Sequence, residues 1–186
     1  MAPKVKVTKE EILSSAVELV RRGGAQALNA RNIASVLNCS TQPIFSNFSS
    51  LEELRYAVLV QVDGLYRGYL KAERESGNYP PYKAGGMAYI RFAKEEKELF
   101  KLLFMCDRGD EALYAGAGLD GEMEALVQNQ TGLGEQEARL FHLEAWAYVH
   151  GIATMFATGF LNLEWELVSR MLTDFYQGLR KQKGRD

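Results

Sequence analysis

One stretch, from Asn29 to Phe48, constrains the fold of this chain more than any other, because it has the pattern of two short helices joined by a tight turn. Asn29 is placed to cap the first helix, whose apolar positions are spaced to form one face. These positions are Ile33, Ala34 and Leu37. Asn38 and Cys39 then interrupt the pattern, and Ser40 is a favourable cap for a second helix. The stretch therefore predicts a helix-turn-helix unit.

The second helix of this unit has a polar surface that suits a DNA groove. Three apolar side chains are expected to anchor it inward: Ile44, Phe45 and Phe48. The side chains expected to face outward are short and polar, with no carboxylate among them: Thr41, Gln42, Ser46 and Asn47. Such donors and acceptors can meet base edges without repelling phosphate. A short helix pair also occurs in all-helical proteins that bind no DNA. The flanking sequence is therefore needed to distinguish a DNA-binding unit from an ordinary helix pair.

Residues 8–60 resemble the N-terminal DNA-binding domain of the tetracycline-repressor (TetR) family in the order and spacing of their segments. The matching segments are Ile12, Leu13, Ala16 and Leu19 in a first helix, Gly23 and Gly24 at its end, Arg31 to Ala34 in a second, Ser40 to Phe48 in a third, and Glu52, Glu53 and Leu54 opening a long fourth. A shorter segment, from Ala145-Trp146 to His150-Gly151, resembles the Trp-His-Gly signature of one subgroup's ligand-binding half.

The resemblance implies an all-α fold with two parts. Residues 1–50 would form a three-helix DNA-binding head with the helix-turn-helix, and residues 51–186 a ligand-binding and dimerisation body of about six helices. It also implies a homodimer that binds double-stranded DNA. The side chains that we expect to contact DNA are Lys4, Lys6, Asn29, Arg31, Thr41, Gln42, Ser46 and Asn47. Thr41 and Gln42 are our candidates for reading bases, since glutamine pairs well with adenine.

Two residues depart from the family pattern. Phe45 stands where the family usually has a tyrosine whose hydroxyl meets phosphate, and Leu51 stands where a lysine commonly opens the fourth helix. Both changes remove contacts with the DNA backbone, which supply the salt-dependent part of affinity.

Charge is unevenly distributed along the chain. Residues 1–48 hold six basic and three acidic side chains, a net charge of +3, and the chain total of −2 leaves −5 for the rest. A basic head on an acidic body fits this asymmetry, although a solvated tail accounts for some of the lysines equally well. Cys39 and Cys106 are too few for a disulfide framework and lack the close pairing of a zinc site.

The remaining sequence predicts further helices. They are a long helix from Leu51 to about Arg74, two shorter ones within 82–105 that meet near 94–97, a piece over 122–130, a long apolar helix over 135–159 and a last helix from Trp165. The last two carry more apolar surface than one small body covers, which suggests a four-helix dimer interface. No apolar run approaches the ~20 residues of a bilayer span, so we expect a cytoplasmic protein without a membrane partner.

The aromatic and methionine side chains of the body have two interpretations. They are either ordinary core, which is the default for any one of them, or the wall of a cavity for a small apolar effector. Our candidates for ligand contacts are Phe92, Phe104, Met105, Trp146, Tyr148 and His150. His142 and His150 are eight residues apart, ~12 Å along a helix, too far to share one metal ion without further ligands. We expect no cofactor, no metal and no catalytic residue.

These observations favour a ligand-responsive transcriptional regulator, most simply a repressor that a small apolar molecule releases from a palindromic operator. The alternative is a small-molecule binding protein whose DNA-binding head is vestigial, which the changes at Phe45 and Leu51 permit. An all-helical enzyme is a third possibility, and it would need turnover that depends on His150.

Overall fold

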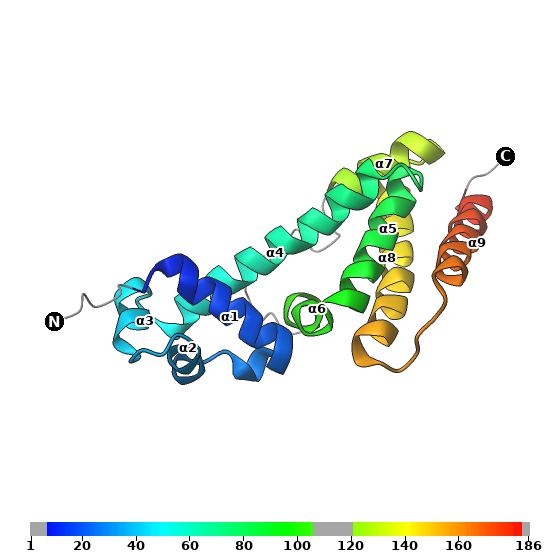
Figure 1. The fold of residues 1–186 in the computed structure, drawn as a ribbon. Helices are drawn as coiled ribbons and strands as arrows, with labels where there is room; N and C mark the ends of the chain where they lie inside the picture. Colours follow the sequence, from blue (N-terminus) through cyan, green and yellow to red (C-terminus); the bar gives the residue numbers. More distant parts are fainter. Residues whose placement is uncertain (1–6, 106–120, 184–186) are drawn as a thin grey trace. The chain divides into compact units, whose positions relative to one another are not determined.

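The computed structural model describes residues 7–105 and 121–183, and over these residues the chain is all helical (Figure 1). The α-helices are α1 (Lys9–Gly23), α2 (Ala30–Val36), α3 (Gln42–Asn47), α4 (Leu51–Glu75), α5 (Pro81–Glu95), α6 (Lys97–Phe104), α7 (Gly121–Thr131), α8 (Glu135–Thr158) and α9 (Trp165–Lys183). A short 3-10 helix, η1 (Ala25–Ala27), precedes α2. The predicted all-α class and the predicted order of helices are confirmed. Residues 106–120, which include Cys106 and most of a glycine-rich stretch, lie outside the described residues.

The described residues form two compact units. The first unit comprises residues 7–65 and 96–105, and the second comprises 66–95 and 121–183. Helix α4 begins in the first unit and ends in the second. Each unit therefore has a core of its own, and we describe the two separately.

Local sequence signals set the ends of the helices in the first unit. Thr8 and Glu11 form the capping box that starts α1, with the Glu11 N–H donating to Thr8 Oγ1 at 3.2 Å. Gly24 ends α1 with a φ of 72°, a backbone conformation that favours glycine. Asn29 caps α2 by accepting a hydrogen bond from the Asn32 N–H at 2.9 Å. The end of α1 at Gly24 and the cap at Asn29 agree with the sequence analysis.

The expected cap on α3 is not formed. The cap position falls at Thr41 instead of Ser40, and the Thr41 backbone is already helical, so its side chain makes no cap hydrogen bond. Pro43 lies in the first turn of α3, where it removes no helical hydrogen bond.

The core of the first unit is mainly aliphatic, and α6 contributes to it. Its fully buried large side chains are Ile12, Val20, Ile33, Ile44, Phe48, Leu54, Leu99 and Phe100. Helix α6 packs against α1, and Arg21 Nε donates to Glu96 Oε2 at 2.8 Å beside this contact. The sequence pattern predicted α6 but not its place against α1.

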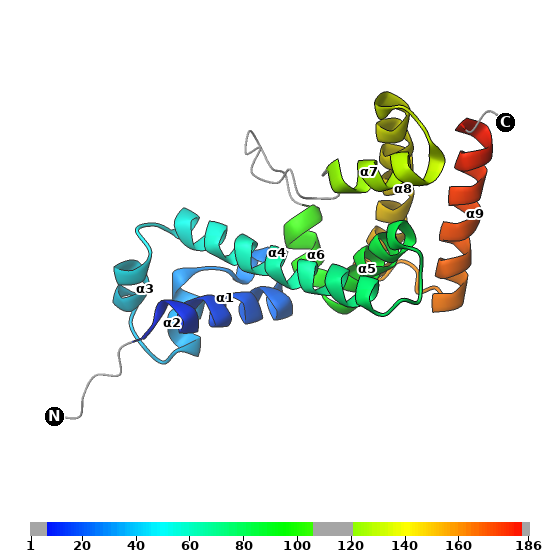
Figure 2. The same cartoon turned by 90° about the horizontal axis from the view of Figure 1, so that it is seen from above.

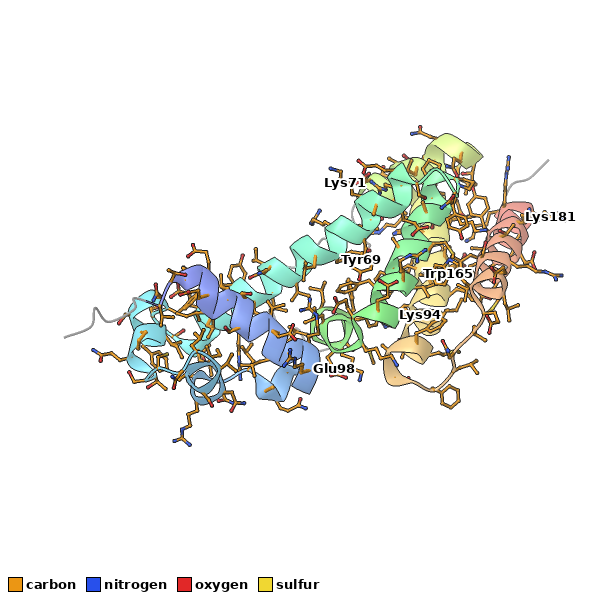
Figure 3. The ribbon with its side chains drawn as sticks, in the orientation of Figure 1. Tyr69, Lys71, Lys94, Glu98, Trp165 and Lys181 are labelled. Atoms are coloured by element: carbon orange, nitrogen blue, oxygen red, sulfur yellow. The ribbon has the colours of Figure 1, made fainter. Side chains whose placement is uncertain are left out.

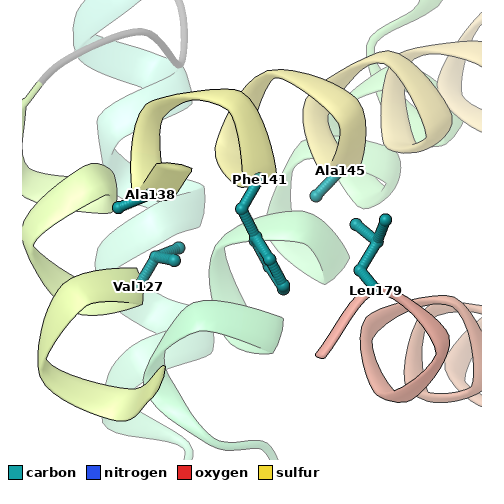
Figure 4. Close-up of a cluster of buried hydrophobic side chains, with 5 residues drawn as sticks. All are labelled: Val127, Ala138, Phe141, Ala145 and Leu179. Carbon is teal, nitrogen blue, oxygen red and sulfur yellow. The ribbon is translucent and has the colours of Figure 1, made fainter. Parts of the chain in front are cut away.

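In the second unit, α5 packs mainly against α8, and both contact α7 and α9 (Figure 2). Phe141 reaches from α8 into a buried cluster with Val127 of α7 and Leu179 of α9 (Figure 4). Ala138 and Ala145 complete this cluster. The small side chains of the two alanines leave room for the Phe141 ring between the helices.

Helix α8 leaves apolar side chains in contact with solvent. Its buried face includes Phe141, Ala145 and Ile152, whereas Leu140 and Leu143 are 44% and 45% exposed. Apolar residues on both sides are unusual for the surface helix of a monomer. None of the described helices has the length and apolarity needed to cross a bilayer.

Candidate functional site

The amino-terminal part of α3 presents polar side chains to solvent. Gln42 and Ser46 are exposed, and Thr41 and Asn47 are half-buried. Ser46 Oγ donates to the Gln42 backbone oxygen at 2.9 Å, and Asn47 Nδ2 donates to the Pro43 oxygen at 2.8 Å. The Gln42 side chain has no hydrogen bond with another described residue. Of the predicted DNA contacts on α3, Gln42 is therefore the one whose amide is fully available.

The other predicted DNA contacts differ in their surroundings. Asn29 is occupied as the cap of α2. Arg31 is exposed, and no carboxylate of the described residues lies within ion-pair distance of it. The other described bases of this region are paired: Lys9 with Glu53, and Arg21 and Arg22 with Glu18. Lys4 and Lys6 lie outside the described residues.

The prediction that Phe45 anchors α3 inward is wrong. Phe45 is 50% exposed, whereas Ile44 and Phe48 are buried. The reason is the helical period, since positions 44 and 48 share one face and position 45 lies about 100° away from it. An aromatic ring therefore accompanies the polar side chains on the outer surface of α3.

The second unit contains a cavity of about 700 Å³ lined only by its own residues. This volume is in the range of small-molecule sites, ~300–1,000 Å³. Seven aromatic side chains line it: Tyr66, Tyr82, Tyr89, Trp146, Tyr148, Phe175 and Tyr176. They come from α4, α5, α8 and α9, and α4 also contributes Lys71 (Figure 3). The composition is that of a binding site for an organic molecule with an apolar body.

Hydrogen bonds and ring stacking fix several of these side chains. The Tyr82 hydroxyl lies 3.0 Å from His142 Nδ1, and the Tyr89 hydroxyl lies 2.8 Å from His150 Nδ1. The His150 ring stacks on Trp146 with centroids 5.0 Å apart. His150 is absent from the cavity wall, but it holds two residues that line it. Both histidines are therefore hydrogen-bonded residues of the core and pocket.

Burial changes the ionisation of four groups at this site. Desolvation raises the pKa values of Tyr82 and Tyr176 and lowers the pKa values of Lys83 and His150. In each case the buried environment disfavours the charged form. Tyr82 therefore stays neutral at physiological pH and can donate or accept a hydrogen bond.

The six predicted ligand contacts separate into three groups. Trp146 and Tyr148 line the cavity. Phe92 is fully buried behind Tyr66, with ring centroids 5.5 Å apart, and His150 supports Trp146. Phe104 and Met105 belong to the first unit and do not line the cavity.

Sequence reasoning missed the polar residues of the cavity. Lys83, Arg74 and Tyr82 line it, but their neighbours lie up to 90 positions away in the chain. The sequence signal for these residues was a mixture of apolar and basic positions along a predicted helix. The same mixture is typical of a helix whose basic face is exposed to solvent. Within the described residues, no group of three or more His, Cys, Asp or Glu side chains could hold a metal ion.

Comparisons with known proteins agree with this geometry. Residues 82–175, just over half of the chain, match the family described as "Tetracyclin repressor-like, C-terminal domain". Among solved structures, a TetR-like transcriptional regulator from Rhodococcus sp. RHA1 is similar with a TM-score of 0.67 and 15% identity, covering 100% of both chains. A TetR family member from Streptomyces coelicolor A3 has a TM-score of 0.62 and 17% identity, covering 89% of this chain and 96% of its own.

A third similar structure is the multidrug binding protein EbrR complexed with imidazole, with a TM-score of 0.55, 16% identity and coverage of 89% and 93%. At these identities the structures show a shared fold. No curated protein matched the chain. The family match covers α7, α8, nearly all of α5 and the first part of α9, but not α4. The chain therefore belongs to the tetracyclin repressor-like (TetR) family, whose members are transcriptional regulators and not enzymes.

Proposed function

We propose that this protein is a dimeric, ligand-responsive repressor that binds a palindromic operator and is released by a small molecule held in the cavity of the second unit. In this proposal residues 1–50 bind DNA, residues 51–186 bind the ligand and dimerise, and the protein works in the cytoplasm. The observation that carries the proposal is the surface of α3, where exposed Gln42 lies beside a buried apolar face formed by Ile44 and Phe48.

The contacts with DNA divide into base reading and backbone positioning. Gln42 reads bases, with Thr41 next to it, because its amide group is free to pair with adenine. Arg31 contacts phosphate, since it is exposed and has no carboxylate partner among the described residues. Ser46 and Asn47 are engaged within the first unit, so their contribution is to position the helix. Lys4 and Lys6 add phosphate contacts.

Ligand binding is coupled to DNA binding through α4. Its carboxyl-terminal half contributes Tyr66, Arg67, Leu70 and Arg74 to the cavity, and its amino-terminal half belongs to the first unit. A ligand that favours one arrangement of residues 66–75 therefore shifts the population of arrangements of residues 51–65. Two heads in a dimer must match a groove spacing of about 34 Å, so a change of a few Å suffices to lose DNA.

The dimer forms through the exposed apolar side of α8. Leu140, Leu143, Ala147 and Gly151 recur every three or four residues and are all exposed, which gives a close-packing stripe. Leu143→Glu tests this, because each copy would bury an unpaired carboxylate at a cost of several kcal/mol. We expect a monomer by analytical ultracentrifugation, with the helical content kept because Leu143 is already 45% exposed.

Val60→Glu is the matched control for this variant. Val60 is 52% exposed on α4 and lies in the first unit, so the same charge there should leave the dimer intact. If wild-type protein is a monomer, or Leu143→Glu remains a dimer, the proposed interface is wrong.

The DNA-binding role is tested by sequencing the genomic fragments that the purified protein retains. We expect one enriched palindromic sequence, and Gln42→Ala should weaken binding to it by about 1–3 kcal/mol. Gln61→Ala is the matched control, since Gln61 is exposed on α4, outside the helix-turn-helix. Equal retention of all fragments would support the alternative, a ligand-binding protein with a vestigial head. That alternative is favoured by Phe45, which exposes a ring without a hydroxyl.

A further inference from the structure

The charged residues around the cavity are predominantly basic. Five bases and two acids line it: Arg67, Lys71, Arg74, Lys83 and Arg180, with Glu75 and Glu122. Both acids already have basic partners, since Glu122 lies 2.7 Å from Arg74 and Glu75 lies 3.8 Å from Lys71. The wall therefore has an excess of three positive charges and no unpaired carboxylate among its described residues.

Lys83 is a half-buried cation of the cavity wall whose printed partners are all uncharged. Its Nζ donates to Ser169 Oγ at 2.7 Å and to Thr173 Oγ1 at 2.8 Å, and it lies 4.9 Å from the centre of the Tyr79 ring. These partners are uncharged, and no carboxylate of the described part of the chain is within ion-pair distance of Lys83. An ammonium group has three donors, so one N–H remains after the two hydroxyls are satisfied.

Two further N–H donors of the cavity residues are buried without an acceptor. They are Trp146 Nε1 and Arg74 Nε, which find no hydrogen-bond partner among the described protein atoms. Both atoms have almost no accessible surface, so neither of them faces the open part of the cavity. The donor that the cavity offers to a ligand is therefore the remaining N–H of Lys83.

A carboxylate accepts hydrogen bonds and donates none, so it matches this set of donors and positive charges. A cationic ligand would meet the positive excess, and a neutral alcohol would leave Lys83 without a counter-charge. The aromatic walls require an apolar body next to the charged group. We infer that the effector is a small organic acid, an apolar or aromatic body that carries a carboxylate, and that Lys83 is the main contact of that carboxylate.

This inference rests on the proposed function only in taking the cavity as the effector site. It replaces a purely apolar effector by an amphipathic anion. Lys83 also links α5 to α9 through Ser169 and Thr173, so a test has to separate recognition of charge from support of the fold. Comparing ligands that differ only in charge does this, because a structural defect weakens all of them alike.

The experiment is isothermal titration of the full-length protein, without DNA, against matched sets of octanoate, phenylacetate and 2-naphthylacetate, their primary amides and the corresponding amines. We expect at least one carboxylate to bind about tenfold or more tightly than its amide, with the amine weakest. In Lys83→Met most of this preference for the carboxylate over the amide should be lost, while thermal melting checks that the variant is folded.

Lys94→Met is the matched control. Lys94 is exposed on the same helix, beside Trp165 with its Nζ 5.7 Å from the ring centre (Figure 3), and it does not line the cavity. The preference for the carboxylate should persist in it. Amides or amines that bind as tightly as the acids, no binding by any member of the sets, or an unchanged preference in Lys83→Met would each overturn the inference. Because no DNA is present, a failure of operator binding would not affect this result.

Discussion

The two units of this protein are held together by contacts of different range. In the first unit, most side-chain hydrogen bonds join residues three to five positions apart, as in the Thr8–Glu11 capping box and the Asn29 cap. Around the cavity of the second unit, most side-chain bonds join residues 46 to 90 positions apart, as between Tyr176 and Gln130 or Lys83 and Thr173.

This difference matches the two tasks that we assign to the units. A surface that docks in a DNA groove needs short helices held at fixed angles, and local caps with a filled aliphatic core provide them. A cavity needs side chains that converge from several helices, and each of them has to be supported by a residue on another helix. The first unit is therefore specified mainly by neighbours in sequence and the second mainly by neighbours in space.

The largest expected effect comes from removing a long-range contact of the second unit. Phe141→Ala deletes a fully buried ring that packs on Val127 and Leu179 and lies 5.3 Å from the Tyr176 ring. We expect a loss of about 3–5 kcal/mol in the free energy of unfolding, measured by chemical denaturation. Phe160→Ala makes the same chemical change at an 80% exposed position and should cost less than about 0.5 kcal/mol. Equal losses in the two variants would show that the buried cluster does not stabilise the second unit.

A local contact of the first unit should contribute less. Thr8→Ala removes the capping box of α1 and should lower the free energy of unfolding by about 1 kcal/mol, within a range of ~0.5–2 kcal/mol. Hydrogen exchange should speed up at the start of α1 and remain unchanged around the cavity. Ser14→Ala, at an exposed position inside the same helix, is the control and should not destabilise. Faster exchange throughout both units would contradict the local character of the first unit.

A change on the outer surface of α3 should affect DNA binding alone. Phe45 is exposed, so Phe45→Tyr adds a hydroxyl without steric cost and restores the residue that is usual in the family. One new hydrogen bond to phosphate is worth about 0.5–1.5 kcal/mol, a roughly two- to tenfold lower Kd for the retained DNA. Phe160→Tyr should leave this Kd unchanged. An unchanged or higher Kd for Phe45→Tyr would mean that position 45 does not approach the DNA backbone.

The smallest effect concerns the pH dependence of the second unit. Burial lowers the pKa of His150 below its ordinary value of 6.5, so the unfolded chain takes up a proton more readily than the folded one. Stability should therefore fall as the pH drops from about 6.5 towards the folded pKa, and it should be unaffected by His150 above that window. In His150→Gln, melting temperatures should fall less between pH 7 and pH 5. If the melting temperatures of the two proteins change with pH in the same way, His150 does not contribute to the pH dependence.

The sequence predicted the helices of both units, and it predicted an outward-facing Gln42 on α3 but only two of the residues that line the cavity, Trp146 and Tyr148. Caps and breakers such as Thr8, Gly24 and Asn29 act within a few residues, so their structural consequences follow from local chemistry. The exposure of Phe45 was also within reach, because it follows from the period of the helix on which Ile44 and Phe48 are buried. The wrong prediction there came from grouping apolar residues by type instead of by face.

The cavity could not be outlined from the sequence for a physical reason. Whether Phe92 or Tyr89 faces the cavity depends on how α5 is rotated against α8, and that rotation is set by many contacts together. Trp146 and Tyr148 were predicted from the aromatic content of the body, whereas Lys83 has no local signal that separates it from a solvated lysine. Its significance appears only once Ser169 and Thr173 are seen on the neighbouring helix.

The central claim is that residues 1–50 bind DNA and that a ligand bound to residues 51–186 controls this binding. The most direct test is a fluorescence anisotropy titration of the enriched DNA and a scrambled duplex, at low and high salt, with and without the best-binding carboxylate. We predict that the protein prefers the enriched DNA at both salt concentrations and that the carboxylate raises its Kd for that DNA by about tenfold or more. Equal affinity for both duplexes at high salt, or an affinity that the carboxylate does not change, would contradict the account.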